Sequence, residues 1–250
     1  MGELRYEVRD RIAILTLNRP ERRNAFTRTM LRAWAESLDT AARDDDVRVI
    51  VVTGAGDHFC SGVDLDEFRA HLGRPHDVKD YLQEEVHAVA RALDRIDKPV
   101  LAAVAGAAVG AGMDMALLAD LRFAGSSARF SEGYIKVGLV PGDGGAWLLP
   151  RLVGSSRALR LLWTGDFLDA TEALACGLVE EVWDDAELLD RVLEFAGRVA
   201  AQPPLPVRMI KRAVRQSARI DFGTHLDLIS SHLAVVTSTD DFRDGPLGQK

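Results

Sequence analysis

Two glycine-containing segments, residues 59–65 (FCSGVDL) and 105–114 (AGAAVGAGMD), have the residue types and spacing that most clearly predict chemistry. Each follows an apolar run typical of a β-strand, residues 47–53 and 99–105, and each precedes a helix-like stretch. The first N–H groups of a helix have no partner within it, and the helix dipole favours negative charge there. Two such donors directed at one point would form an oxyanion hole for a carbonyl oxygen that gains charge during a reaction.

Several carboxylates follow these segments. Asp114 lies just inside the helix predicted after the second segment, and Asp143 lies in a Pro-Gly-Asp-Gly-Gly turn. Either could be a general acid or base. Asp114 could equally complement the helix dipole, and Asp143 could simply form its turn. Glu132, two residues before Tyr134, is a third candidate, and the residue types alone leave both interpretations open.

Strands and helices that could position these residues are predicted by the hydrophobic pattern. We expect strands at residues 4–8, 11–17, 47–53, 100–104, 121–124, 128–130 and 179–183. We expect helices at residues 27–43, 80–96, 112–118, 146–152, 155–163, 170–175, 186–201 and 205–236, the last with a break at Gly223. Polar residues 240–250 are expected to be mobile. This order predicts an α/β core with a helical C-terminal appendage.

Composition narrows the function classes. The 250 residues suit one large domain or a domain with an appendage, and the net charge of -7 disfavours a nucleic-acid binder. Two cysteines, Cys60 and Cys176, are a poor disulfide framework, so a cytoplasmic location is expected. The N-terminus has no apolar signal core, and no run approaches the ~18 apolar residues of a membrane span.

Alternative motifs find little support. The glycines of residues 49–56 and 106–112 do not match the G-x-G-x-x-G fingerprint, which disfavours a nicotinamide oxidoreductase. The chain has no Walker A, G-x-S-x-G or H-E-x-x-H sequence, and no metal site is expected. Surface or structural positions are expected for the six histidines: His58, His71, His76, His87, His225 and His232.

Five segments, in the right order, resemble motifs of the crotonase superfamily, the enoyl-CoA hydratase/isomerase family. They are residues 17–25 (LNRPERRNA), 59–65, 97–114, 130–150 and 164–179. The likeness extends over about residues 4 to 215. It implies a crotonase-like spiral of repeated ββα units over residues 1–200 with a helical C-terminal region over residues 201–250. It also implies an acyl-CoA substrate, no separate cofactor, and a homotrimer or homohexamer without membrane or nucleic-acid partners.

The resemblance also assigns roles to residues. By position, the backbone N–H groups of Val63 and Ala111 would stabilise a thioester enolate. The coenzyme A part would lie along a set of residues near the first segment: Arg22, Ala25, Val63, Asp64, Leu65, Asp66 and Gly110.

The chain departs from the family's hydratases at one position. The first of their two catalytic glutamates falls on Asp114, but the second falls on Tyr134, a phenol whose ordinary pKa near 10 makes it a poor base. Asp143 is expected to compensate, so Asp114, Asp143 and Tyr134 are the predicted catalytic residues. Hydration of an enoyl-CoA is the leading prediction for the reaction. A double-bond isomerase, a carbon–carbon bond hydrolase and a catalytically weak acyl-CoA-binding relative are the alternatives.

Overall fold

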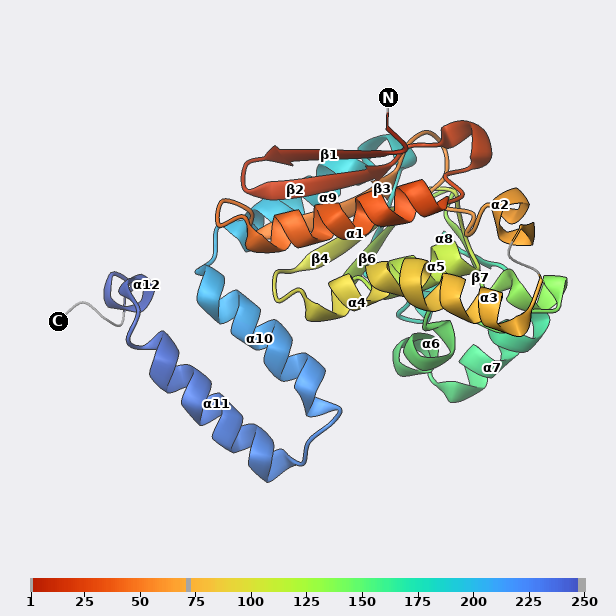
Figure 1. The fold of residues 1–250 in the computed structure, drawn as a ribbon. Helices are drawn as coiled ribbons and strands as arrows, with labels where there is room; N and C mark the ends of the chain where they lie inside the picture. Colours follow the sequence, from red (N-terminus) through yellow and green to blue (C-terminus); the bar gives the residue numbers. More distant parts are fainter. Residues whose placement is uncertain (1, 71–72, 247–250) are drawn as a thin grey trace.

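The computed structural model describes residues 2–70 and 73–246, with a six-stranded sheet at its centre (Figure 1). The strand order is β1-β2-β3-β4-β6-β9. The strands are β1 (Leu4–Arg9), β2 (Ile12–Leu17), β3 (Val49–Gly54), β4 (Val100–Val104), β6 (Leu121–Gly125) and β9 (Val182–Trp183). β1 and β2 form the predicted antiparallel hairpin, while the other neighbouring pairs run parallel. The carboxyl ends of the parallel strands therefore meet at one edge of the sheet.

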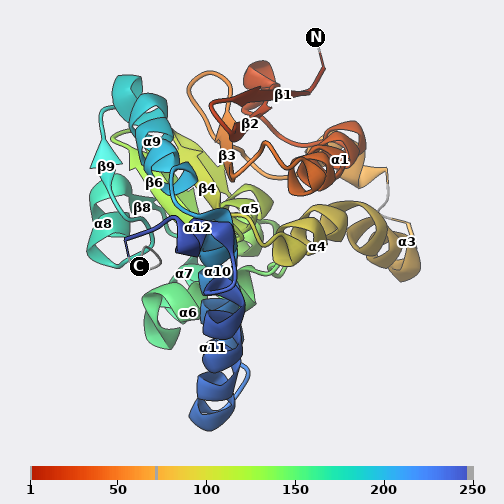
Figure 2. The ribbon, with the colours of Figure 1, turned by 90° about the vertical axis from the view of Figure 1, so that its left-hand side faces the viewer.

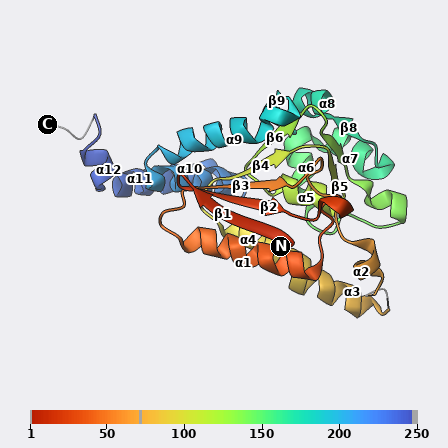
Figure 3. The same cartoon turned by 90° about the horizontal axis from the view of Figure 1, so that it is seen from above.

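Different helices cover the two faces of this sheet (Figure 3). Side chains alternate between the faces along each strand. One set packs against α9 (Asp185–Ala200), and the other lies on the side of α1 (Arg28–Arg43) and α4 (His87–Arg95). The first set includes Ile14, Val51 and Leu101, and the second includes Leu15, Val52 and Ala102. Burial on both faces explains why these strands read as continuous apolar runs.

A second, three-stranded sheet continues directly from the first. Its order is β5-β7-β8, with β5 (Ala107–Val109), β7 (Arg129–Ser131) and β8 (Leu168–Asp169). The chain leaves β4, enters β5 and then begins α5 (Ala111–Leu117). The second glycine segment therefore joins the two sheets.

The remaining helices surround these sheets. They are α2 (Leu65–Arg69), α3 (Pro75–Tyr81), α6 (Gly145–Val153), α7 (Ser155–Thr164) and α8 (Ala170–Ala175), with 3-10 turns at Pro20–Arg22 and Gly133–Val137. The predicted α/β class is confirmed. Among the described residues, no helix combines the length and the apolar character needed to cross a membrane.

The C-terminal helices α10 (Pro204–Ser217) and α11 (Phe222–Val236) pack side by side and project away from the sheets (Figures 1 and 2). The Nζ atom of Lys211 lies 2.7 Å from Oδ2 of Asp120, so this ion pair anchors α10 to the segment between α5 and β6. Arg215 adds a second ion pair to Asp120 at 2.9 Å. The boundary predicted at residue 200 stays a prediction.

Several predicted elements were wrong in detail. The helix expected at residues 80–96 begins earlier, as α3, and passes through a π-helical turn at Leu82–Val86 before α4. The strand expected at 179–183 is shortened to Val182–Trp183, although the backbone of Glu180 and Glu181 also hydrogen-bonds to β6. Gly223 lies inside α11, and the break precedes it, where Asp221 caps the helix.

No helix was predicted in the C-terminal tail, but Asp240–Arg243 forms α12, capped by Thr239. Thr239 followed by Asp240 and Asp241 is a short N-cap signal for this helix. His71 and residues 247–250 of the predicted tail lie outside the described residues.

Candidate functional site

The structure brings the two glycine segments together. The N–H of Cys60 donates to the carbonyl of Ala107 at 2.9 Å, and the N–H of Val109 donates to the carbonyl of Cys60 at 3.0 Å. Residues distant in sequence thereby form one short parallel bridge, between Cys60 and Ala108. The bridge fixes the backbone on either side of it, including Val63 and Ala111.

Glycine is required where the segments approach most closely. A Cβ atom at Gly112 would lie 2.2 Å from the carbonyl oxygen of Cys60. Gly62 has φ +94°, and a Cβ there would lie 3.4 Å from the nitrogen of Ala111. The Gly62–Val63 backbone therefore lies beside the first turn of α5. Among the described backbone hydrogen bonds, the N–H groups of Val63 and Ala111 do not act as donors.

Asp114, Tyr134 and Asp143 form a hydrogen-bonded cluster next to this backbone. The Tyr134 hydroxyl lies 2.7 Å from Oδ2 of Asp114 and 3.1 Å from Oδ2 of Asp143. The N–H of Asp143 also donates to Oδ2 of Asp114 at 3.2 Å. A Cβ at Gly110 would lie 3.8 Å from the Tyr134 ring, which places the cluster against the second glycine segment.

Three elements position this cluster. Asp114 lies in the first turn of α5 and is fully buried. Tyr134 lies in the 3-10 turn after β7, and Asp143 lies in the loop before α6. Positive φ angles at Gly138 (+75°) and Gly144 (+114°) let that loop fold back over α5.

Burial and mutual repulsion weaken the acidity of this cluster. Burial, and then the charge of Asp143, raises the pKa of Asp114 to about 7. Burial raises the pKa of Asp143 to about 6. Burial and the same two acids raise the pKa of Tyr134, so the phenol stays protonated. Carboxyls with pKa values near neutrality can both accept and release protons there.

Glu132, the third candidate carboxyl of the sequence, belongs to the same cluster, although it was not among the three predicted catalytic residues. Its carboxyl is 1% exposed and lies within hydrogen-bonding reach of the Asp114 carboxyl. Burial, followed by the charge of Asp114, raises the pKa of Glu132 to about 10. Its position two residues before Tyr134 was noted, but no sequence pattern indicated that it would be buried.

His87 was expected to be unremarkable, but it lies at the edge of the cluster. Its Nε2 atom lies 2.8 Å from the carbonyl oxygen of Gly142 and 3.9 Å from Oδ1 of Asp143. His87 is the first residue of α4, and this helix places its side chain beside the loop before α6. Because it is distant from the loop in sequence, spacing could not indicate this contact.

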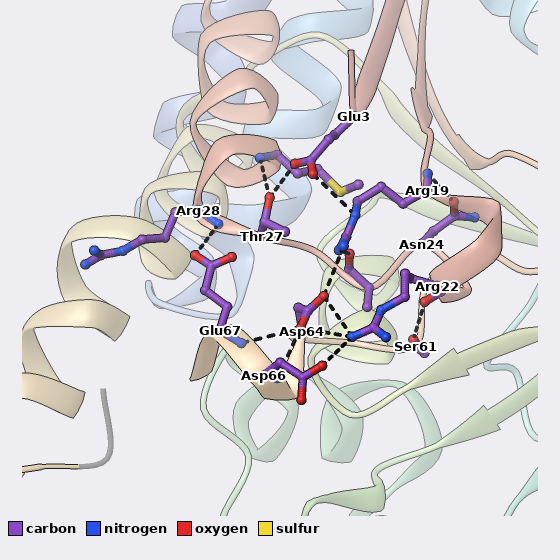
Figure 4. A network of polar contacts seen from close by, with 12 residues as sticks. Glu3, Arg19, Arg22, Asn24, Thr27, Arg28, Ser61, Asp64, Asp66 and Glu67 are labelled. Carbon is purple, nitrogen blue, oxygen red and sulfur yellow. Dashed lines mark hydrogen bonds and ion pairs between the residues drawn. The ribbon is translucent and has the colours of Figure 1, made fainter. Parts of the chain in front are cut away.

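Three of the residues assigned to coenzyme A, Arg22, Asp64 and Asp66, lie close together in one polar network near the first glycine segment (Figure 4). Arg22 is half exposed and pairs with Asp66 at 2.7 Å. Asp64 is buried, pairs with Arg19 at 3.0 Å and caps α2 by accepting from the N–H of Asp66. The Asp64 side chain is therefore occupied by structural contacts, and so is its backbone, whose N–H donates to Phe26 and whose carbonyl accepts from Phe68.

Ala25, Leu65 and Gly110 complete the assigned set. Ala25 is buried and its carbonyl accepts from Arg19. Leu65 is 48% exposed, so its side chain is available to a ligand. Gly110 has φ +53°, and its N–H donates to the carbonyl of Ser131 at 2.7 Å, which joins β5 to β7.

Asn24 was also missed, and it explains part of the motif at residues 17–25. Its side chain is buried and donates to the carbonyls of Ala55 and His58 at 2.9 and 2.6 Å. Its own φ is +54°, a conformation that asparagine tolerates better than most residues. Asn24 thus fixes the loop that leads to the first glycine segment.

The structure gives two further residues in or near the first glycine segment, His58 and Cys60, no catalytic role. His58 Nδ1 accepts from the N–H of Ala107 at 3.2 Å, and burial raises the pKa of Cys60 to about 12. Within residues 2–70 and 73–246, no group of three or more potential ligands is placed to hold a metal ion.

Comparisons with known proteins agree with one another. A family model described as enoyl-CoA hydratase/isomerase matches residues 7–249. A relative from Escherichia coli K12 named 1,2-epoxyphenylacetyl-CoA isomerase is 37% identical, over 94% of this chain and 90% of its own length. A short-chain-enoyl-CoA hydratase from Clostridium acetobutylicum is 33% identical, over 95% of this chain and 90% of its own length. A crystal structure of an enoyl-CoA hydratase from Bacillus anthracis superposes with a TM-score of 0.90 at 30% identity, covering 95% of this chain and 92% of that one.

Proposed function

This chain belongs to the enoyl-CoA hydratase/isomerase family and is an acyl-CoA enzyme of the hydratase type, and we propose that Asp114, Tyr134 and Asp143 carry its proton chemistry. The observation that supports this most strongly is the single Tyr134 hydroxyl between two buried carboxyls. A hydroxyl has one proton and can donate to only one of them. The other carboxyl interacts favourably with the phenol oxygen only if it carries a proton itself. The arrangement therefore suits a pair of acids that share one proton.

Distances suggest where that proton lies. The shorter contact, 2.7 Å, is from Tyr134 to Asp114, so the phenol donates to Asp114 as the acceptor. Asp143, at 3.1 Å, is then the proton carrier; the pKa values of about 7 for Asp114 and about 6 for Asp143 favour the opposite order, but they lie so close together that the hydrogen-bond geometry decides. Asp114 is the general base and Asp143 the general acid in this assignment, with Tyr134 as the link between them.

The backbone N–H groups of Val63 and Ala111 form the oxyanion hole in this proposal. Their segments are held together by the Cys60–Ala108 bridge, and Ala111 begins a helix whose dipole favours negative charge. In other enzymes, removing one such donor lowers the rate by about 10²–10³. The coenzyme A part lies along Arg22, Ala25, Gly110 and residues 63–66, and the chemistry needs no further cofactor.

Hydration then proceeds with a balanced transfer of protons. Asp114 takes a proton from water while the water oxygen bonds to C3 of the enoyl thioester. The C2–C3 π electrons move to the thioester oxygen, where the two N–H groups stabilise the enolate. Asp143 gives its proton to C2 as the carbonyl reforms. Tyr134 passes the proton of Asp114 to Asp143, which restores the starting state.

A double-bond isomerase is the second candidate. The observation that favours it is Tyr134, whose hydroxyl contacts the carboxyls of both Asp114 and Asp143. Tyr134 also stands at the position where hydratases of the family carry a second glutamate. The 37% identical relative named as an isomerase supports the same candidate. An isomerase would move a proton between C2 and C4 through one acid without adding water.

One experiment separates the two candidates. The enzyme is incubated in deuterated water with crotonyl-CoA, a 3-enoyl-CoA, and aromatic or alicyclic enoyl thioesters, and products are analysed by mass spectrometry. Hydration adds the mass of water to crotonyl-CoA. Incorporation of deuterium without addition of water would identify an isomerase. Binding without any turnover would contradict both candidates and favour a binding protein.

We also propose that the chain assembles as a homotrimer or homohexamer in the cytoplasm. A largely apolar groove of about 500 Å³ lies between α10 and α11. Ile210 and Leu233 on its rim are 64% and 62% exposed, an arrangement that favours cover by another copy. Both cysteines are free thiols, which is compatible with a reducing compartment.

A further inference from the structure

Glu132 is a buried acid to which the proposed reaction assigns no step. Within the described residues, neither of its carboxyl oxygens has a donor within hydrogen-bonding distance, and Oδ1 of Asp114 is in the same situation. A Cβ at Gly145 would lie 2.1 Å from Oδ1 of Asp114 and 2.7 Å from Oε1 of Glu132. The two unsatisfied oxygens thus lie side by side against a backbone that has no side chain to separate them.

Repulsion between the buried carboxyls determines whether Asp114 and Glu132 are protonated. Asp114, Glu132 and Asp143 face one another across α5, the 3-10 turn and the loop before α6, together with the neutral Tyr134. His87 is the nearby histidine, and it faces Asp143, not Glu132. Three buried carboxylates cannot all ionise at such short range. Burial raises the pKa of Glu132 the most, to about 10, so it is the acid that keeps its proton.

We propose that Glu132 is a positioning residue whose neutral carboxylic acid donates a hydrogen bond to Oδ1 of Asp114. This bond satisfies the oxygen of Asp114 that faces away from Tyr134. Oδ2 of Asp114 is then left directed at the Tyr134 hydroxyl and the Asp143 N–H, at 2.7 and 3.2 Å. The role rests on the proposed function of Asp114 as the base.

The donated bond has a measurable consequence. It stabilises the ionised form of Asp114, and so holds its pKa below the value that burial alone would give. Loss of a hydrogen bond to a buried carboxylate should raise the pKa of Asp114 by about one to two units. The acid limb of the pH–rate profile should move upward by the same amount.

Two variants test this consequence. Glu132→Gln keeps an N–H donor of similar shape, whereas Glu132→Leu removes the donor. We expect the Leu variant to lose about 10- to 100-fold of kcat near pH 7, with its acid limb shifted upward and KM changed little. We expect the Gln variant to keep the acid limb near its original position and to recover most of kcat. A folded Leu variant with an unshifted limb, or a folded Gln variant as impaired as the Leu variant, would overturn the proposal.

Infrared spectroscopy can detect the proton on the Glu132 carboxyl without measuring enzyme activity. In deuterated buffer near pH 8.5, Asp114 and Asp143 are mostly ionised, so a remaining carbonyl band of a protonated acid reports Glu132. The band should be present in the wild type and in Asp143→Asn, and absent in Glu132→Gln. Its absence from the wild type would overturn the proposal. A normal band together with full turnover by Asp114→Asn would instead contradict the proposed function alone.

Discussion

At the scale of residues, one phenol determines the character of the site. Tyr134 contacts both Asp114 and Asp143, which lie on different elements. The sequence indicated these three residues through a family resemblance, and the structure brings them together. Glu132 was a candidate acid from the sequence, but its burial and the position of His87 beside Asp143 could not be predicted, because burial of a polar side chain depends on long-range packing and not on local spacing.

The first prediction concerns the pH dependence of kcat/KM. The pKa of Asp114 is raised to about 7 and that of Asp143 to about 6, so the pair holds one proton between its two macroscopic pKa values. Activity should therefore peak near pH 6 to 7. It should fall at lower pH, as the base is protonated, and at higher pH, as the shared proton is lost. A profile that is flat from about pH 5 to about pH 9 would contradict the shared-proton assignment.

A second prediction concerns stability. The folded pKa of Asp114 lies above its unfolded value near 3.9, so the folded state binds the proton more tightly. Ionisation then costs stability, and the free energy of unfolding falls as pH rises from about 4 to about 7. Asp114→Asn removes this cost and should stabilise the protein by about 1–3 kcal/mol at pH 8, but little at pH 4. Urea unfolding at the two pH values measures the difference, and an equal effect at both would contradict it.

At the scale of elements, the site depends on contact between two glycine segments. The strands leading into them were predicted within a few residues, because runs of β-branched residues have a strong local pattern. The bridge between Cys60 and Ala108 was not predictable from local pattern, because it joins segments that are distant in sequence. The π-helical turn at Leu82–Val86 could likewise not be predicted, because the apolar spacing there still fits an ordinary helix.

The contact gives a third prediction, for Gly112→Ala. The new Cβ would lie 2.2 Å from the carbonyl of Cys60, so the segments must separate. We expect destabilisation of about 2–4 kcal/mol and a fall in kcat of about 10²-fold or more, through loss of the proposed oxyanion-hole geometry. Chemical denaturation and steady-state kinetics measure both.

Gly197→Ala is the matched control. Gly197 lies within α9, and a Cβ there would have nothing within 4 Å. This variant should be more stable by roughly 0.5–1 kcal/mol, with unchanged activity. If Gly112→Ala behaved like the control, close approach of the segments would not be what forms the site.

At the scale of the whole molecule, the C-terminal helices provide the next test. The helical pattern of residues 205–236 was predictable, but the way α10 and α11 pair was not. Their apolar groove leads to a fourth prediction, that Ile210→Glu weakens assembly. Light scattering coupled to gel filtration should show a shift from trimer or hexamer towards monomer.

Val235→Glu is the control for the assembly test. Val235 is 48% exposed on α11 but does not line the groove. It should leave assembly unchanged. A wild-type protein that is monomeric at micromolar concentration would contradict the proposed assembly directly.

The central claim is that Asp143 is the proton carrier in a pair linked by Tyr134. The most direct test is the turnover of Asp143→Asn with the best substrate of the acyl-CoA panel. This nearly isosteric change should leave the fold and acyl-CoA binding intact and lower kcat by about 10²–10⁴-fold, because the acid can no longer supply its proton. Unchanged turnover by a correctly folded Asp143→Asn protein would contradict the account.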